Sequence, residues 1–348
     1  MRALTGSCTG GKFLTMTIRR RKFLQLALLT GINTGLVSSA YADDDTATSP
    51  TLKQMITHPL LVNSLYRVSV SKEYAADGAA GSNQDHYQWI EEQRQGAEWI
   101  VRGTARQKPE WIAMGWKQLD WGLAQQKSDG GFDSKDPFHS TSFFVEALAR
   151  SCLIDPVGAT ANRVNGLRQS ANWLMSSNGT KKGISNNLPY THRRYILAAA
   201  FGQSAAVTQN VEFKSTAEQW AENGLALQRE DGTNPEKGGY DVGYQMVGVL
   251  MALRYLPVCD NPQLRARLRN MMRRAIAPEL ARQAPDGSFS TEGSTRIGSE
   301  HARSGKVKDV PYNEILQAWV YAAQALPQPD LIESATKIAQ LRGWLKVR

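Results

Sequence analysis

The sequence contains few of the residues that bind metals or form disulfides. Only three of its 348 residues are cysteines and five are histidines, and none stands in a C-x-x-C or H-x-x-x-H spacing. We therefore expect no metal site and no cofactor. Cys152 and Cys259 are either two buried free thiols or a disulfide pair, and the frequent burial of free cysteine favours thiols.

Three further features are missing. The chain has no stretch of alternating apolar and polar residues, so we expect no β-sheet in the main domain. No apolar run reaches the roughly 20 residues of a membrane span. The net charge of +9 arises largely in residues 1–42, which hold six of the 41 Lys and Arg residues and no acid. The remainder is nearly balanced, which gives no reason to expect nucleic-acid binding.

The first 42 residues have the features of an export signal. The segment Arg-Arg-Arg-Lys-Phe-Leu at 19–24 fits the twin-arginine pattern, and Ala-Tyr-Ala at 40–42 is a small-x-small cleavage site. A membrane anchor is the alternative, but the apolar run is short for one. We expect a bacterial signal peptide over 1–42, a disordered leader over 43–50 and one catalytic domain over 51–348. That domain would act in the periplasm or outside the cell, without a membrane span.

A turn motif recurs about every fifty residues. Gln-x-x-Asp-Gly begins at Gln126, Gln228 and Gln283, and a degenerate copy, Asn178-Gly179, lies between the first two. Asp and Gly in these positions are typical of turns. A period of this length with one turn in each repeat is typical of an array of helical hairpins.

The helical segments alternate in character. Segments that begin near residues 141, 190, 240 and 311 are apolar around most of their circumference, whereas the segments that follow them are amphipathic. A helix that is apolar all round is buried, and an amphipathic helix faces water on one side. The alternation predicts an all-α fold, a single (α/α) toroid or barrel of about five to six helical hairpins. The loops before the inner helices should gather at one end and form a cleft.

The loops expected at the cleft are rich in polar and titratable side chains. Tyr240 and Tyr244 are four residues apart at the expected start of an inner helix, so both phenols would face the same cleft. The candidate site residues from these loops are Asn187, Tyr190, His192, Arg193, Arg194, Glu236, Tyr240, Asp241, Tyr244, Gln245, Arg296, His301 and Arg303.

Residues 180–256 resemble polysaccharide lyases of the α/α-toroid type, alginate lyases in particular. The resemblance rests on Asn-Asn-x-x-Tyr at 186–190 and Asp-Gly-x-x-Pro-Glu at 231–236, separated by an outer helix and followed by a tyrosine-rich helix start. The family usually has His directly after the second Asn. Here Leu188 occupies that place and His192 comes four residues after it. The resemblance implies cleavage of an anionic, uronic-acid-containing polysaccharide or oligosaccharide by β-elimination.

The resemblance also implies roles for individual residues. Asn187 would neutralise the substrate carboxylate and His192 would be the base. Tyr240 or Tyr244 would be the acid, or both acid and base if nearby cations lower its pKa. The remaining candidates would bind substrate, with Arg193 or Arg194 holding the anionic sugar. Each residue also has a structural alternative: a helix cap for Asn187, a buried histidine for His192, core aromatics for the tyrosines and paired surface cations for the arginines.

Other functions stay open at this point. A glycoside hydrolase on the same toroid would need two carboxylates, for which Glu236 or Asp241 with Asp133 or Glu292 are candidates. A non-catalytic glycan-binding protein of the envelope would also use a concave toroid surface. The motif Gln-x-x-Asp-Gly-x-Phe resembles a repeat of terpene cyclases and prenyltransferases, but the chain has neither a DxDD-type acidic run nor zinc ligands. The sugar, the linkage, endo or exo action and the oligomeric state are not determined by the sequence.

Overall fold

The computed structural model describes residues 49–68, 70, 75, 77–80, 86–302, 305–326, 328 and 330–345. The expected export signal over 1–42 and residues 43–48 of the expected leader lie outside the described residues. Everything that follows concerns the unit Asp44–Arg348. Within the part of the chain that is described, none of the helices combines the length and the apolar character needed to cross a membrane.

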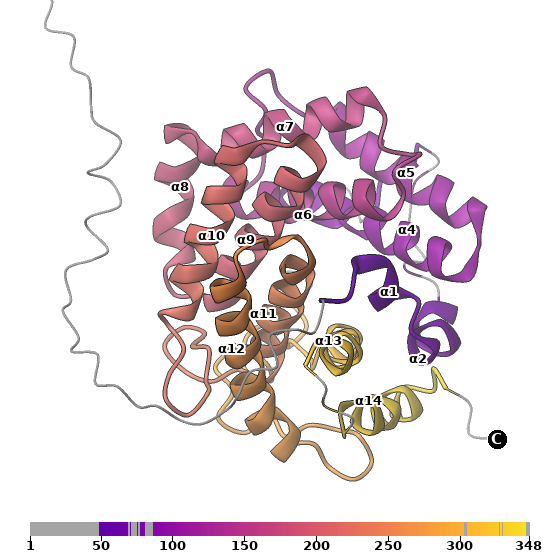
Figure 1. Ribbon diagram of the computed structural model, residues 1–348, viewed down its shortest axis with the longest axis vertical. Helices are drawn as coiled ribbons and strands as arrows, with labels where there is room; N and C mark the ends of the chain where they lie inside the picture. Colours follow the sequence, from indigo (N-terminus) through magenta and orange to yellow (C-terminus); the bar gives the residue numbers. More distant parts are fainter. Residues whose placement is uncertain are drawn as a thin grey trace, which may run out of the picture. The chain divides into compact units, whose positions relative to one another are not determined.

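Five helical hairpins form the body of this unit, and each pairs an inner helix with an outer one (Figure 1). The inner helices are α4 (Gln95–Arg106), α6 (Pro137–Ile154), α9 (Thr191–Thr208), α11 (Val242–Tyr255) and α13 (Tyr312–Ala325). Their outer partners are α5 (Pro109–Ala124), α7 (Ala161–Met175), α10 (Val211–Leu225), α12 (Pro262–Ala281) and α14 (Asp330–Leu341). The inner helices pack against one another in chain order. The predicted all-α toroid is confirmed.

Short N-terminal elements close the ring between its first and last inner helices. α1 (Leu52–Ile56), α2 (Pro59–Asn63) and the 3-10 turn η3 (Leu65–Arg67) contact α4, and α1 and α2 also contact α13. The hydroxyls of Tyr66 and Tyr321 lie 3.3 Å apart across this seam, and both side chains are buried. These N-terminal elements therefore complete the toroid.

Each full copy of the recurring turn motif follows an outer helix and is hydrogen-bonded to the next outer helix along the chain. In each copy the Asp accepts a backbone N–H two residues on, at 2.8–3.0 Å. The Gln side chains of Gln126, Gln228 and Gln283 each donate to a carbonyl on the next outer helix at 2.8–3.0 Å. The motif glycines have φ of 86–92°, where a Cβ would lie 2.1–2.6 Å from backbone atoms of that helix. The repeat is therefore a structural device.

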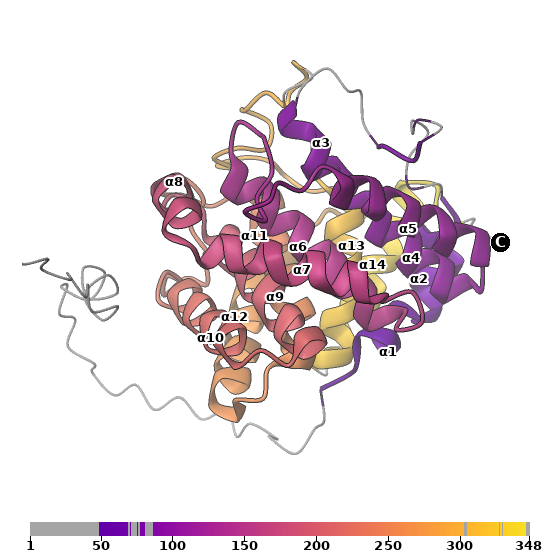
Figure 2. The ribbon, with the colours of Figure 1, turned by 90° about the horizontal axis from the view of Figure 1, so that it is seen from above.

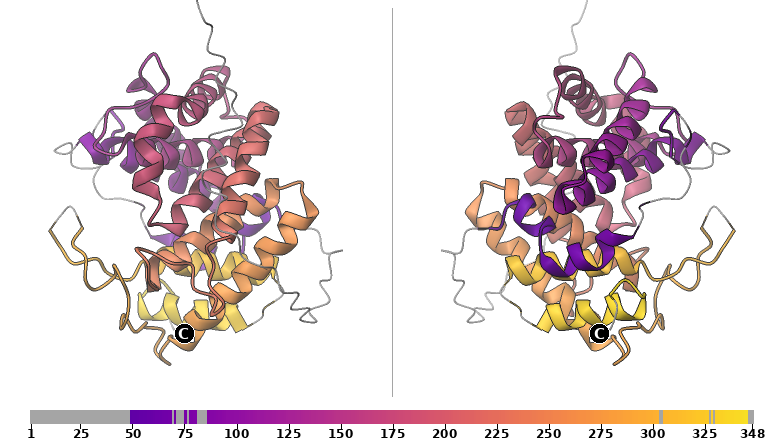
Figure 3. Two further views of the ribbon diagram at one scale, coloured as in Figure 1. Left: turned by 90° about the vertical axis from the view of Figure 1, so that its left-hand side faces the viewer. Right: turned by 90° about the vertical axis from the view of Figure 1, so that its right-hand side faces the viewer.

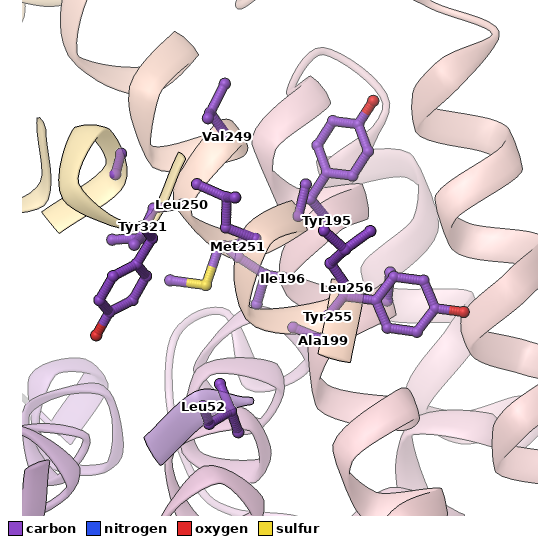
Figure 4. Close-up of a cluster of buried hydrophobic side chains, with 14 of the residues drawn as sticks. Leu52, Tyr195, Ile196, Ala199, Val249, Leu250, Met251, Tyr255, Leu256 and Tyr321 are labelled. Atoms are coloured by element: carbon purple, nitrogen blue, oxygen red, sulfur yellow. The ribbon is translucent and has the colours of Figure 1, made fainter. Parts of the chain in front are cut away.

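The core lies between the inner helices and beneath the outer ones. Figure 4 shows Ile196 of α9 close to Met251 of α11. Nearly every residue of α6 and α9 is buried, as expected for helices surrounded by protein. Cys152 and Cys259 are buried free thiols.

Besides α1 and α2, two helices in the described part of the chain lie outside the hairpin pattern. α3 (His86–Gln93) precedes α4, and at the same edge of the molecule the chain between α12 and α13 extends away from the helices (Figures 2 and 3). α8 (Ser177–Asn187) occupies a segment that was expected to be mostly loop. Asn187 is therefore the last residue of α8. It does not cap α9, whose N-cap residue is Tyr190.

Candidate active site

A cavity of about 940 Å³ lies inside the ring of inner helices. Its lining includes His139, Tyr190, Gly243 and Asn313, which stand at or near the starts of α6, α9, α11 and α13. The starts of these inner helices therefore meet at one cleft. The chain between α12 and α13 adds further lining residues, from Arg296 to Pro311.

His192 is fixed at the start of α9 by Glu236. The Nδ1 atom of the imidazole lies 2.8 Å from one carboxylate oxygen of Glu236, and the other oxygen accepts the backbone N–H of His192 at 2.8 Å. Both side chains are almost fully buried. A tight turn presents the carboxylate: Glu236 N–H donates to the Gly239 carbonyl, and Gly238 has φ 85°. This turn is tied to α9 because Lys237 N–H donates to the Pro189 carbonyl.

The environment of His192 favours a neutral imidazole. Burial lowers its pKa below the ordinary value of 6.5, and this effect outweighs the opposing influence of Glu236. A carboxylate can only accept hydrogen bonds, so the neutral ring carries its proton on Nδ1. Nε2 then has a free lone pair. His192 lines the cavity, so this geometry is suited to a general base.

Tyr244 lies between His192 and a pair of cations. The rings of His192 and Tyr244 are 4.8 Å apart, centroid to centroid. The guanidinium carbon of Arg296 lies 3.5 Å from the centroid of the Tyr244 ring, and Lys308 Nζ lies 5.3 Å from it. All four side chains line the cavity. Two positively charged side chains therefore lie beside the Tyr244 ring inside the cavity.

Glu300 holds the cations in place. It accepts from Arg296 Nε at 3.1 Å and from Lys308 Nζ at 2.6 Å, and it also pairs with Lys237. Burial would raise the pKa of Glu300, but these three cations more than offset it and lower the pKa to about 2. Glu236 also lies 3.7 Å from Arg296 Nη1, so the three cations and two carboxylates leave one positive charge in excess.

Asp241 connects the start of α11 to the segment that carries Arg296. One carboxylate oxygen accepts the N–H groups of Gly243 and Tyr244, at 3.1 and 2.8 Å. The other accepts the backbone N–H groups of Arg296 and Ile297, at 2.8 and 2.9 Å, and the Ser294 hydroxyl at 2.9 Å. The side chain is fully buried and does not line the cavity. It positions Tyr244 and Arg296 relative to each other.

Asp241→Ala is expected to lower the free energy of unfolding by about 2–4 kcal/mol, because it removes a helix cap and leaves buried N–H groups without partners. Urea unfolding followed by circular dichroism measures this. Asp286→Ala is the matched control, since Asp286 accepts a turn N–H at an exposed position, and it should cost less than about 1 kcal/mol. Equal losses in the two variants would contradict the positioning role.

Of the three candidates Asn187, Arg193 and Arg194, only Arg193 lines the cavity. Arg193 lines the cavity, and it donates to Asn187 Oδ1 at 2.9 Å and pairs with Asp136 at 3.1 Å. Asn187 is buried beside it and does not line the cavity. Arg194 also lies away from the cavity, where it donates to the carbonyls of Asn187 and Tyr190 and so closes the end of α8.

Other candidates fall into two groups. Tyr190 and His301 line the cavity, together with Arg296. Tyr240 and Gln245 do not: the Tyr240 hydroxyl donates to Glu279 at 2.5 Å, and the Gln245 amide bonds to the backbone of Asn234 and Ala275. Burial, reinforced by Glu279, raises the pKa of Tyr240 strongly. Arg303 lies outside the described residues.

The carboxylates considered for a hydrolase do not form a pair across the cavity. Glu236 and Asp241 are fully buried behind the lining, and Asp133 and Glu292 are exposed on the surface. None of the four lines the cavity. These four residues therefore do not supply the sugar-facing carboxyl groups that retaining and inverting hydrolases both need.

Several lining residues were not among the candidate site residues. His139, Glu300 and Lys308 lie in cleft segments but no motif distinguishes them. Further charged side chains on the inner helices, Glu98, Glu146, Arg150 and Arg254, also line the cavity. A charged residue within an otherwise apolar helix was a usable signal for Glu146, Arg150 and Arg254, since a buried charge needs a partner.

Comparison with known proteins gives a likeness of fold. No protein-family model matches this chain, and no curated protein matches it. Among solved structures, the chain is similar to the unsaturated glucuronyl hydrolase of Bacillus sp. GL1, which is responsible for the degradation of glycosaminoglycan. The match has a TM-score of 0.50 and 13% identity, and it covers 83% of each chain. It agrees with the α/α toroid described above.

Proposed function

We propose that this protein is a polysaccharide-degrading enzyme that cleaves a uronic-acid-containing chain by β-elimination. The observation that carries the proposal is the contact of a neutral, carboxylate-fixed imidazole, His192, with the ring of Tyr244 under Arg296, inside one cavity. The resemblance to toroid lyases and the glycosaminoglycan-degrading neighbour support a glycan as the substrate class.

The reaction has three requirements that these side chains can meet. The carboxylate of the uronic acid must be neutralised so that its C5 proton becomes acidic, and Arg193 and Arg296 are the cavity arginines suited to this. His192 Nε2 takes the C5 proton. The electron pair of the C5–H bond forms the C4–C5 double bond, the C4–O4 bond breaks, and the Tyr244 hydroxyl gives its proton to O4.

The site can be restored without consuming water. After product release, the proton on His192 returns to the Tyr244 oxygen, directly or through a bound water molecule. The positive charge of Arg296 over the ring stabilises the phenolate in the meantime. Asn187, which the resemblance gave as the neutralising residue, acts in this proposal by holding Arg193.

A panel of polysaccharides tests the proposal. Residues 43–348 would be incubated with several polyuronates, glycosaminoglycans and neutral glucans, while ultraviolet absorbance and new reducing ends are followed together. β-Elimination predicts that both rise, on uronic-acid chains alone. Reducing ends that appear without absorbance would contradict elimination, and binding without either signal would favour the non-catalytic alternative.

The rate should depend on pH through His192. Because burial lowers its pKa below 6.5, the imidazole is neutral and active at pH 7, and kcat/KM should fall only as the pH drops through that lowered value. The folded protein then loses a stabilising contribution over the same acidic range. The measurement is kcat/KM between pH 4 and 8, and an acidic limb centred above 6.5 would contradict the assignment.

Hydrolysis is the second candidate, and one side chain favours it. Glu314 lines the cavity, burial raises its pKa, and its Oε2 atom has no hydrogen-bond partner among the described residues. A carboxyl group with a raised pKa is suited to protonating a leaving oxygen. The neighbour is itself a hydrolase of unsaturated glucuronyl groups. Release of a monosaccharide from unsaturated oligosaccharides, lost in Glu314→Gln, would support this candidate over the first.

We also propose that residues 1–42 direct export by the twin-arginine route. The support is the Arg-Arg-Arg-Lys-Phe-Leu segment and the small-x-small site. Cell fractionation of the full chain in a bacterium should find the processed protein outside the cytoplasm. The Arg19→Lys/Arg20→Lys/Arg21→Lys variant should stay inside, and unchanged export of that variant would contradict the proposal.

A further inference from the structure

A second group of charged side chains lines the cavity and takes no part in the proposed reaction. We call it the floor cluster, and it consists of Glu98 and Arg102 on α4, Glu146 and Arg150 on α6 and Arg254 on α11. Arg254 follows Tyr244 by ten residues of the same helix, which corresponds to about 15 Å along the axis. The floor cluster therefore lies well below the His192–Tyr244 pair.

The cluster is closely packed. Glu98 Oε1 accepts from Arg150 at 3.1 Å and from Arg254 at 3.2 Å. Glu146 Oε1 accepts from Arg150 Nε at 2.9 Å and lies 3.5 Å from Arg254 Nη1. Burial would raise the pKa of Glu98, but the surrounding arginines lower it to about 2, so the carboxylate stays charged.

Behind the cluster the cavity is closed by the core. The guanidinium of Arg102 lies 5.8 Å from the ring of Tyr66, and Tyr66 bonds to Tyr321 across the seam of the toroid. Both tyrosines are at most 2% exposed, and neither lines the cavity. A chain that enters from the loop end would therefore stop at the floor cluster.

The hydrogen bonds of the cluster are incomplete. Its three arginines are each at most 5% exposed, and its carboxyl neighbours are Glu98, Glu146 and, on α13, Glu314, which interacts with Arg102 and Arg254. Arg150 Nη1, Arg254 Nε and Arg102 Nε have no hydrogen-bond partner among the described residues, and neither has Glu98 Oε2. Unpaired buried donors are unfavourable unless a ligand completes them.

We infer that the floor cluster is a subsite for the carboxylate of an acidic sugar at the end of the substrate chain. The carboxylate would accept from the guanidinium groups of the cluster, and Glu98 would accept from a sugar hydroxyl. The substrate then enters end first and is cut at a fixed distance from that end. This mode of action rests on the proposed function, whereas binding of the acidic sugar does not.

Binding of glucuronate tests the subsite without turnover. Calorimetric titration and thermal shift are measured with glucuronate and with its neutral methyl ester. The wild-type protein should bind glucuronate and bind the ester about tenfold or more weakly. Arg254→Gln should lose this preference, and Arg254→Lys should recover part of it. Arg267→Gln, at an exposed ion pair outside the cavity, should keep it. Equal binding of acid and ester by the wild type would overturn the inference even if the variants do not fold.

Product lengths test the mode of action. A polyuronate digest should release one short product from the first turnovers, with little loss of viscosity. If glucuronate binding depends on Arg254 but the digest gives fragments of random length, cleavage at a fixed distance from the chain end is overturned. Loss of the acid preference in Arg296→Gln but not in Arg254→Gln would place the subsite elsewhere. If no polymer is cleaved while Arg254-dependent binding is present, the proposed function fails and the subsite stands.

Discussion

His192→Ala is expected to lower kcat on the cleaved polyuronate by about 10²–10⁴-fold, with little change in KM. Nδ1 of the His192 imidazole is hydrogen-bonded to the buried carboxylate of Glu236. Burial lowers the pKa of the imidazole and so keeps the ring neutral. Its loss removes the acceptor for the C5 proton and leaves the arginines that bind the substrate. Steady-state kinetics on purified protein, with a melting temperature to verify folding, makes the measurement.

Glu236→Gln is the companion variant for this prediction. The amide keeps the shape of the carboxylate but can donate as well as accept, so Nδ1 of His192 is no longer required to carry the proton. The expected loss in kcat is smaller than that of His192→Ala and larger than tenfold. Activity within threefold of wild type in both variants would exclude His192 as the base.

Tyr244→Phe is expected to lower kcat by a similar factor of about 10²–10⁴. The substitution keeps the ring between His192 and Arg296 and removes only the hydroxyl that protonates the leaving oxygen. Tyr240→Phe is the matched control, because the Tyr240 hydroxyl bonds to Glu279 outside the cavity. That variant should retain most of the activity and lose some stability.

The two tyrosine variants also separate two interpretations of the sequence. If Tyr240→Phe abolished turnover and Tyr244→Phe did not, the site would have to lie on the other side of α11. If neither affected turnover, proton transfer to the leaving group would come from another residue, and Glu314 would be the first to test.

Much of the fold could be predicted because its signals are local and periodic. Each of the three full Gln-x-x-Asp-Gly turns follows one outer helix and is hydrogen-bonded to the next outer helix along the chain. The apolar character of α6, α9, α11 and α13 correctly places them inside. α4 was harder to place, because an inner helix that carries Glu98 and Arg102 does not look apolar all round.

The site was predicted in part, and the differences have physical causes. Tyr240 and Tyr244 share a helix face only if both are helical, but Asp241 is the cap and α11 begins at Val242. Tyr240 therefore points elsewhere. Asn187 and Arg194 were expected at a loop, but α8 extends to Asn187, and both serve its end. The pairing of Glu98 with Arg254 spans 156 positions and has no local signature.

The most direct measurement is the mass of the two products formed from a defined uronate oligosaccharide. β-Elimination transfers a proton within the site and consumes no water, so the account predicts that the two product masses add up to the mass of the substrate. The product from the reducing side of the cut should carry the double bond and absorb in the ultraviolet. Product masses that exceed the substrate by one water would contradict the account and show hydrolysis instead.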